Sequence, residues 1–380
     1  MSGRPSRVLL RGPRVVCADG VLEDGWVLVE GERIAAVGAG PAAEHDAVTE
    51  LQGWLLPGFV DLHVHGGGGH DVTSSPGDLA AAVDFHRRHG TTSTLVSLVT
   101  APLDALERQL GWVADAAADD PGVLGAHLEG PYLSHARCGA QNPAYLRVPQ
   151  RAEFDRLLTA ARGVLRSITV APELPGGPAL IAAAAETGAV AAIGHTDATY
   201  AEAMAGIEAG ARLATHLFNG MRPIHHREPG PAVAALRAGL VCEIIHDGVH
   251  LHPAGPALVA ERPGRLAFVT DAIDAAGMGD GEVVLGGQRV QVRDGQARLV
   301  PSGSLAGSTL TMDAAVRRAV RESGLDVVAA SAAASGTPAR LLGLDGELGA
   351  VAPGLVADLV LLDDELNLRA VMSRGRWLAG

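Results

Sequence analysis

The sequence places histidines at the end of an apolar run that begins near residue 55. His63 and His65 are two residues apart, so they share one face if this run is a β-strand. Two imidazoles on one face can bind one metal ion. Four glycines follow at residues 66–69, and glycine allows the backbone to approach a site closely. His63 and His65 are therefore candidate metal ligands.

Three further runs end in side chains that bind metals. Glu129 ends the run 122–129, His195 ends the run 189–195 and His216 ends the run 212–216. Each residue alone could be structural, as an exposed loop glutamate or a packed histidine. A carboxylate at an apolar strand end is costly to bury unless it is paired or metal-bound. Together with the first pair, these residues predict one metal centre.

Asp271 ends a fifth run, at residues 265–271. A carboxylate that faces a metal-activated water can remove its proton and later deliver that proton to a leaving amine. Asp271 is thus a candidate catalytic acid and base for hydrolysis. The alternative is a structural aspartate that caps a following helix.

Strand-like runs alternate with Ala- and Leu-rich helical segments through the middle of the chain. The eight runs cover residues 55–65, 93–99, 122–129, 167–172, 189–195, 212–216, 240–246 and 265–271. Eight such alternations predict a (β/α)8 TIM-like barrel, an α/β fold whose active sites lie at the carboxyl ends of the strands. A β excursion at 281–300 and a last helix near 311–323 complete this part.

Both ends of the chain carry short strand-like runs separated by turns. We predict a small β-sandwich domain that is formed by both termini. The predicted division is 1–54 for its N-terminal part, 55–345 for the barrel and 346–380 for its C-terminal part.

Composition narrows the function further. The chain of 380 residues has a net charge of −13, which argues against nucleic-acid binding. All 30 basic residues are arginine, so the chain has no lysine. Three scattered cysteines indicate a reducing compartment, and the apolar run at residues 8–10 is too short for a signal peptide or a membrane span. A cytoplasmic protein without membrane contact is predicted.

The motifs in their order along the chain resemble the N-acetylglucosamine-6-phosphate deacetylase family of the amidohydrolase superfamily. They are residues 55–65 (LLPGFVDLHVH), 127–132 (HLEGPY), 194–198 (GHTDA), 215–221 (THLFNGM), 227–230 (REPG), 247–250 (DGVH) and 305–308 (LAGS). The resemblance covers nearly the whole chain.

The resemblance implies roles for individual residues. Glu129, His195 and His216 match the main metal ligands, Asp271 matches the acid/base, and His63 and His65 make a second metal plausible. Matching substrate contacts are Ala140, Asn219, Gly220, His250, Leu305, Ala306 and Gly307. Arg227 matches an arginine that reaches the phosphate in the neighbouring subunit, which implies a homodimer.

The implied reaction is hydrolysis of N-acetyl-D-glucosamine 6-phosphate to D-glucosamine 6-phosphate and acetate, in amino-sugar catabolism or recycling. One or two divalent metals per subunit are implied, with zinc preferred and iron, manganese or cobalt also compatible. Related amidohydrolases bridge two metals with a carboxylated lysine, which this chain lacks, so Glu129 is the natural bridge or sole carboxylate ligand. The alternatives are a deacetylase of N-acetylgalactosamine 6-phosphate or of an N-acyl amino acid, or a non-catalytic assembly module.

Overall fold

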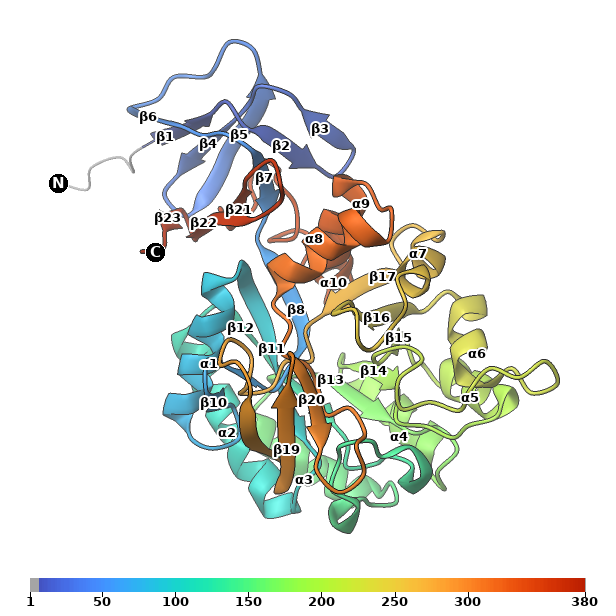
Figure 1. Ribbon diagram of the computed structural model, residues 1–380. Helices are drawn as coiled ribbons and strands as arrows, with labels where there is room; N and C mark the ends of the chain where they lie inside the picture. The colour runs from blue at the N-terminus through green and yellow to red at the C-terminus, as the bar shows by residue number, and fades with distance from the viewer. Residues whose placement is uncertain (1–6, 380) are drawn as a thin grey trace.

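Eight parallel strands form a barrel at the centre of the structure, a computed structural model that describes residues 7–379 (Figure 1). The strands follow one another around the barrel in chain order: β8 (Phe59–Val64), β11 (Thr91–Val99), β12 (Val123–Glu129), β13 (Leu165–Val170), β14 (Val190–Ile193), β15 (Leu213–Ala214), β16 (Val241–Ile245) and β17 (Leu266–Val269). The barrel closes just beyond β8 and β17, where the Asp271 N–H donates to His63 O at 2.8 Å and the His65 N–H donates to Ala272 O at 2.8 Å. The predicted barrel fold is confirmed.

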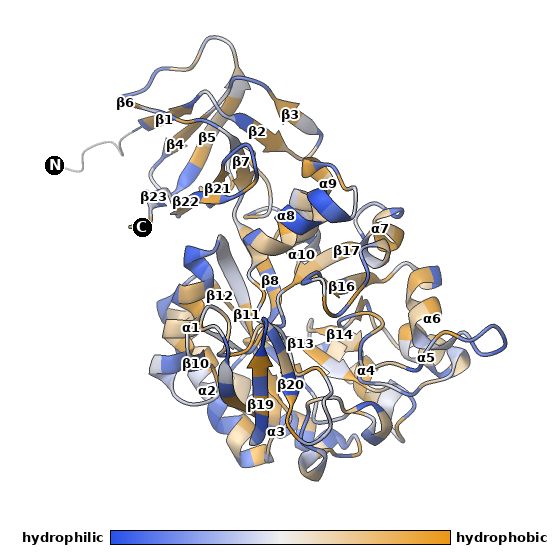
Figure 2. Cartoon of the chain, viewed as in Figure 1, coloured by the Kyte–Doolittle hydropathy of each residue, from blue (hydrophilic) through white to orange (hydrophobic). Residues whose placement is uncertain are grey.

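Helices cover the outside of the barrel. They are α1 (Pro76–Arg88), α2 (Leu103–Asp119), α3 (Arg151–Ala161), α4 (Gly177–Glu186), α5 (Tyr200–Glu208), α6 (Gly230–Ala238), α7 (Ala254–Ala260), α8 (Met312–Glu322), α9 (Val327–Ser331) and α10 (Thr337–Leu341), with short helical turns at His135–Arg137, Pro143–Tyr145 and Ala332–Gly336. In α2, the buried residues Leu106, Leu110 and Val113 recur at helical spacing and face the strands. Figure 2 shows hydrophilic and hydrophobic residues alternating around these outer helices.

The strands are apolar because the barrel covers both of their faces. All nine residues of β11 are buried, and β14, β16 and β17 are buried throughout. A parallel sheet that is covered on both sides requires such continuous burial and shows no alternation of polar and apolar residues. Because the interior is buried, any charged side chain inside the barrel needs an opposite charge, a metal ion or hydrogen bonds to compensate for the loss of water.

Two further sheets at the chain ends pack together as a sandwich beside the barrel (Figure 1). One has the order β5 (Arg33–Ala39), β4 (Gly25–Glu30), β1 (Arg7–Arg11), β6 (Ala47–Glu50), and the other has the order β23 (Arg376–Trp377), β22 (Leu368–Ser373), β21 (Leu359–Leu362), β7 (Trp54–Pro57), β2 (Arg14–Cys17), β3 (Gly20–Leu22). Leu10 and Val27 of the first sheet share a core with Leu55 and Leu361 of the second. The strands β1, β3 and β6 are short, with three to five residues each.

The predicted first barrel strand at 55–65 is in fact two strands, because the chain is divided at Gly58. β7 pairs with β21 of the sandwich, and β8 begins the barrel. The backbone passes so close to β11 at this point that a Cβ on Gly58 would lie 2.2 Å from Thr92 Oγ1. The domain limits at 54/55 and 345/346 stay a prediction, and β7 lies across the first of them. Residues 1–6 and Gly380, within the predicted sandwich ranges, lie outside the described residues.

A small three-stranded sheet follows the barrel, as the sequence predicted for 281–300. It consists of β18 (Gly281–Leu285), β19 (Gln288–Arg293) and β20 (Gln296–Leu299), and Figure 1 shows it in front of the barrel strands. A two-stranded pair, β9 (Gly66–Gly67) and β10 (His70–Asp71), lies directly after β8. Among residues 7–379, no helix combines the length and the apolar character that a membrane crossing requires.

Asp61 joins the first and last barrel strands and should contribute strongly to stability. Its buried carboxylate accepts hydrogen bonds from Thr270 Oγ1 at 2.6 Å, the Thr270 N–H at 3.2 Å and the His63 N–H at 3.1 Å. Asp61→Ala leaves these donors unpaired, so the free energy of unfolding should fall by about 2–4 kcal/mol. Asp61→Asn keeps the acceptor oxygen and should lose less. Urea unfolding followed by circular dichroism measures both, and equal losses would contradict this role.

Candidate active site

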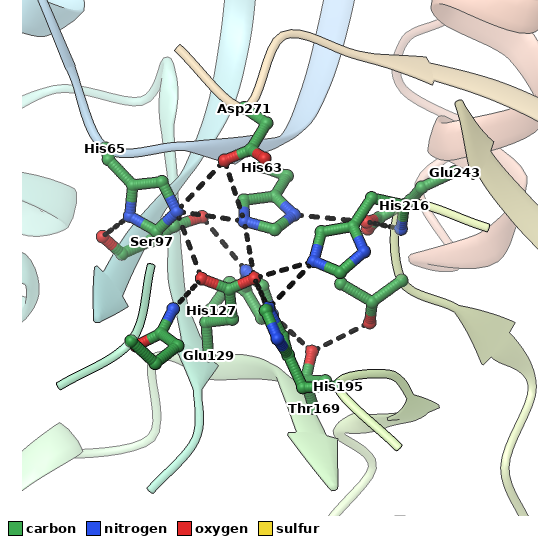
Figure 3. Close-up of polar contacts among 12 residues, drawn as sticks. His63, His65, Ser97, His127, Glu129, Thr169, His195, His216, Glu243 and Asp271 are labelled. Atoms are coloured by element: carbon green, nitrogen blue, oxygen red, sulfur yellow. Dashed lines mark hydrogen bonds and ion pairs between the residues drawn. The ribbon is translucent and has the colours of Figure 1, made fainter. Parts of the chain in front are cut away.

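Six predicted site residues meet at the carboxyl ends of the barrel strands (Figure 3). His63 lies in β8 and Glu129 ends β12, while the other four follow their strands by one or two residues: His65, His195, His216 and Asp271. None of the six is more than 7% exposed. Five different strands therefore deliver these side chains to one buried place.

The Glu129 carboxylate lies at the centre of the group. Its Oε1 is 3.0 Å from Nε2 of His195 and 3.0 Å from Nε2 of His216. On the other side, His65 Nε2 is 3.3 Å from Oε2 and His63 Nε2 is 3.4 Å from Oε1. Glu129 is thus shared by two sets of ligand atoms, one with His63 and His65 and one with His195 and His216.

In three of the imidazoles, the contact made by Nδ1 leaves Nε2 suited to bind a cation. Nδ1 of His65, His195 and His216 contacts a backbone carbonyl, at 3.1, 2.8 and 3.1 Å respectively. A carbonyl only accepts, so each Nδ1 carries a proton, and a ring that loses its second proton presents a lone pair at Nε2. Nε2 of His195 and Nε2 of His216 are 3.0 Å apart, a distance at which protons on both would clash. A metal ion shared by these nitrogens and Glu129 fits this arrangement.

The charges in the site favour ionised carboxylates. Burial raises the pKa of Asp271, but His63 and the hydrogen bond with His65 outweigh it and hold the pKa at about 2. Burial likewise raises the pKa of Glu129, and His63 and His195 hold it well below its usual range. Both groups are therefore carboxylates near neutral pH. Asp271 Oδ1 is 3.3 Å from His65 Nε2, beside the ligand set.

Three site residues have a backbone conformation that is unusual for side chains other than glycine. His195, His216 and Asp271 have φ angles of 45°, 30° and 47°. Such left-handed conformations cost about 1–3 kcal/mol each and persist only where surrounding contacts hold them. Gly220 passes close to one of these side chains, since a Cβ on it would lie 3.0 Å from His195 Nδ1. The turns aim the side chains into the barrel mouth immediately after each strand ends.

Glu243 is a site residue that sequence reasoning missed. It lies in β16, is 1% exposed, and contacts two of the candidate metal ligands, His63 and His216. Its Oε2 is 3.2 Å from His63 Nδ1 and accepts the His216 N–H at 3.2 Å. The available signal was a glutamate inside an otherwise apolar strand, where a charge needs a partner.

Two more buried side chains, Gln141 and His127, lie beside this group, and the sequence predicted no supporting role for either. The Gln141 amide donates to Glu129 Oε2, and its oxygen accepts the Thr100 N–H at 2.7 Å. His127 lies beneath, with Nδ1 2.9 Å from Ser97 Oγ and Nε2 2.8 Å from Thr169 Oγ1. Burial and the charge of His63 lower the pKa of His127 well below its usual value. Both ring nitrogens of His127 are occupied, so it supports the site and does not face it.

A cavity opens above the ligand set. Among its lining residues are six of the predicted substrate contacts: Ala140, Asn219, Gly220, His250, Leu305 and Gly307. His250 Nδ1 is 2.7 Å from Asp247 Oδ2, which leaves Nε2 available. Ala306 does not line this cavity; it packs with Val290 and Val292 of β19 and donates its N–H to Ala297 O at 3.0 Å.

Arg227 also lies away from the cavity of its own chain. It belongs to the exposed loop before α6, and its Nη1 is 2.7 Å from His226 Nε2. Figure 1 shows the chain between β15 and α6 extending outward at the edge of the barrel. Its predicted contact with a neighbouring subunit stays a prediction.

Asp197 connects the two loops that border the cavity. One carboxylate oxygen accepts from Arg137 Nε at 2.8 Å, and the other accepts from Arg222 Nη2 at 2.8 Å. The Arg137 carbonyl is the group that holds His195 Nδ1. The sequence motif contained Asp197, but only the structure shows that it ties the loop at 134–141 to the loop at 219–230.

Fold and site together define a class of protein: a barrel hydrolase in which a carboxylate and imidazoles at the strand ends form a metal-type ligand set. The amidohydrolase family model matches residues 54–378. N-acetylglucosamine-6-phosphate deacetylases are similar over most of their length. The one from Lysinibacillus sphaericus is 34% identical over 97% of each chain, and the one from Bos taurus is 37% identical over 84% of this chain and 82% of its own. The chain belongs to the amidohydrolase family and, within it, to the N-acetylglucosamine-6-phosphate deacetylases.

A solved structure and a third relative extend this comparison. A mutant of N-acetyl-D-glucosamine-6-phosphate deacetylase from Mycobacterium smegmatis, in complex with N-acetyl-D-glucosamine-6-phosphate, is 43% identical with a TM-score of 0.94, covering 98% of this chain and 99% of its own. An N-acetylgalactosamine-6-phosphate deacetylase from Escherichia coli is 38% identical over 97% of this chain and 98% of its own.

Glu243 should affect how tightly the site binds metal. Glu243→Gln replaces the carboxylate that orients His63, so metal affinity should fall by about 10- to 100-fold. Competition with a chromophoric chelator measures this affinity for added zinc. Asp358→Asn, a second buried carboxylate outside the site, is the matched control and should retain the original affinity. Equal affinities of the two variants would show that Glu243 has only a packing role.

Proposed function

We propose that this chain hydrolyses the acetamide of N-acetyl-D-glucosamine 6-phosphate, releasing acetate and D-glucosamine 6-phosphate, in amino-sugar catabolism or recycling. The observation that carries the proposal is the Glu129 carboxylate shared by two imidazole pairs, with the Asp271 carboxylate beside it at the floor of a sugar-sized cavity. The similar deacetylase from Mycobacterium smegmatis, whose structure is a complex with this sugar phosphate, supports the choice of substrate.

Glu129, His195 and His216 would hold the main metal, and His63 and His65 would hold a second one with Glu129 between them. A bound divalent metal supplies Lewis acidity, which lowers the pKa of water and polarises a carbonyl. We propose zinc, since the ligand set combines imidazoles with a carboxylate; iron, manganese and cobalt accept the same ligands. The shared carboxylate of Glu129 would take the role that a carboxylated lysine has in related enzymes, because this chain contains no lysine.

The residues around the ligand set divide the work of hydrolysis. Asp271 is ionised near neutral pH, so it can accept the proton of the attacking water and return it to the departing nitrogen. His250 is oriented by Asp247 and can present Nε2 to the amide oxygen. The backbone of the loops around Ala140, Gly220 and Gly307 would enclose the sugar.

The substrate phosphate requires a cation, and among residues 7–379 no arginine lines the cavity. We propose that Arg227 of a second copy supplies it, because Arg227 is exposed and turned away from its own cavity. The working unit is then a homodimer. The free cysteines Cys17, Cys138 and Cys242 support a reducing, cytoplasmic setting.

A second candidate substrate is N-acetylgalactosamine 6-phosphate. The similar Escherichia coli protein is named for this sugar. The two sugars differ in the configuration of one hydroxyl group, and the reacting groups proposed above do not depend on that hydroxyl. Assays on both epimers therefore belong to the test of the proposed function.

Asp271→Asn should reduce acetate release to below a few percent of the original rate, because the amide cannot accept the proton of water. Metal content, measured by elemental analysis of the same preparation, should be retained. Asp274→Asn changes a carboxylate three residues further along the same loop and should remain active. Substantial activity of Asp271→Asn with metal bound would exclude Asp271 as the acid/base.

Arg227→Ala should raise KM for the phosphorylated sugar at least tenfold, about 1.4 kcal/mol of binding, and leave the slow reaction of unphosphorylated N-acetylglucosamine unchanged. Steady-state acetate release on both sugars and on the galactosamine epimer measures this. Arg237→Ala, an exposed arginine on α6, is the control.

Subunit exchange tests the homodimer directly. When Arg227→Ala and Asp271→Asn subunits are mixed, a mixed dimer contains one site with both residues intact, so activity should recover. The absence of recovery, in a mixture shown to exchange subunits, would place Arg227 outside the neighbouring site.

A further inference from the structure

A second cavity, of about 510 Å³, lies at the end of the barrel opposite the candidate active site. Its walls come from the segments that precede β15, β16 and β17, together with α10. Arg212, Arg265 and Arg340 lie around it, with Thr337 and several apolar residues completing the wall. We call it the basic cavity.

The basic cavity stands out in an acidic protein. The chain has a net charge of −13, yet none of the described residues that line this cavity is acidic. Four other cavities of the structure each include at least one carboxylate in their walls. Three arginines around a concave surface create a local positive potential that attracts anions.

The three guanidinium groups have no protein anion as a partner. Within residues 7–379, Arg212, Arg265 and Arg340 form no ion pair with a carboxylate within 4.0 Å, and their side chains donate no hydrogen bond to the protein. Elsewhere in the chain many arginines do pair, as Arg137 and Arg222 do with Asp197. The donors around the basic cavity are therefore available to a ligand.

Glycine turns bring two of these arginines close to the backbone. Gly239 and Gly264 have φ angles of 72° and 73°, a conformation that favours glycine. A Cβ on Gly264 would lie 3.0 Å from Arg340 Nη1, and one on Gly239 would lie 3.7 Å from Arg265 Nε. The guanidinium groups thus occupy the space that these glycines leave open beside the cavity.

We propose that the basic cavity binds a small phosphorylated molecule. Arginine forks match the geometry of phosphate oxygens, and a phosphate supplies the acceptors that the three guanidinium groups lack. Thr337, 3% exposed, adds a hydroxyl, while Ile207, Leu240 and Leu341 offer an apolar wall to an organic part of the ligand. The volume lies within the range of small-molecule sites. The proposal does not depend on the proposed catalytic function.

The test measures binding of inorganic pyrophosphate and of a nucleoside diphosphate by calorimetry at 0.15 M salt. All proteins carry Arg227→Ala, so that phosphate binding at the active site is weakened. Pyrophosphate should bind this background, and adding Arg212→Ala, Arg265→Ala and Arg340→Ala should weaken binding at least tenfold. The control adds Arg88→Ala, Arg108→Ala and Arg376→Ala, which remove the same charge from exposed positions outside the cavity.

Tighter binding of the nucleoside diphosphate than of pyrophosphate would support an organic ligand on the apolar wall. No binding to the background protein would overturn the proposal. Equal weakening by the two triple variants would also overturn it, since general electrostatics would then explain the affinity. If the cavity triple variant does not fold, Arg265→Gln alone should weaken pyrophosphate binding severalfold, and unchanged binding would count against the site.

Discussion

The carboxylate of Glu129, surrounded by four imidazoles, is the interaction on which the rest of the site depends. A buried carboxylate is unfavourable unless charge and hydrogen bonds compensate for lost water. Here His63 and His65 approach from one side and His195 and His216 from the other, while Gln141 donates from below. Because one group is common to both halves, a displacement of Glu129 would disturb both sets of ligand atoms together.

The residues around Glu129 reach their positions through a strained backbone, which neighbouring contacts hold in place. The left-handed backbone of His195, His216 and Asp271 is unfavourable in isolation, and the barrel holds it through close contacts and backbone hydrogen bonds. Glu243 spans the distance between His63 and the backbone of His216, so the supporting layer is also shared between the two halves. The continuous burial of the barrel strands stabilises the fold, and this stability compensates for the local backbone strain.

The two ends of the barrel present opposite chemistry. At the carboxyl ends, Glu129 and Asp271 give a negative site that suits cations and a proton-transferring base. At the amino ends, Arg212, Arg265 and Arg340 give a positive cavity. The separation follows from the fold, because parallel strands place all their carboxyl ends on one side and all their amino ends on the other.

Much of this protein was determined by the sequence alone. The eight apolar runs predicted the barrel because burial on both faces leaves a continuous apolar pattern, and the side chains after those runs predicted the candidate ligands. His63, His65 and Asp271 could be recognised because each lies at or beside a strand end and so must face the same mouth.

Only the tertiary structure decided which residues support that site. Asp61, Glu243 and Gln141 act through contacts between segments far apart in the chain, and no local spacing encodes such contacts. The division at Gly58 depended on the close passage of β11, and the positions of Ala306 and Arg227 depended on how their loops pack. The local sequence pattern indicates which face of a helix or strand is buried. Which residues pack against that face is decided only when the chain folds.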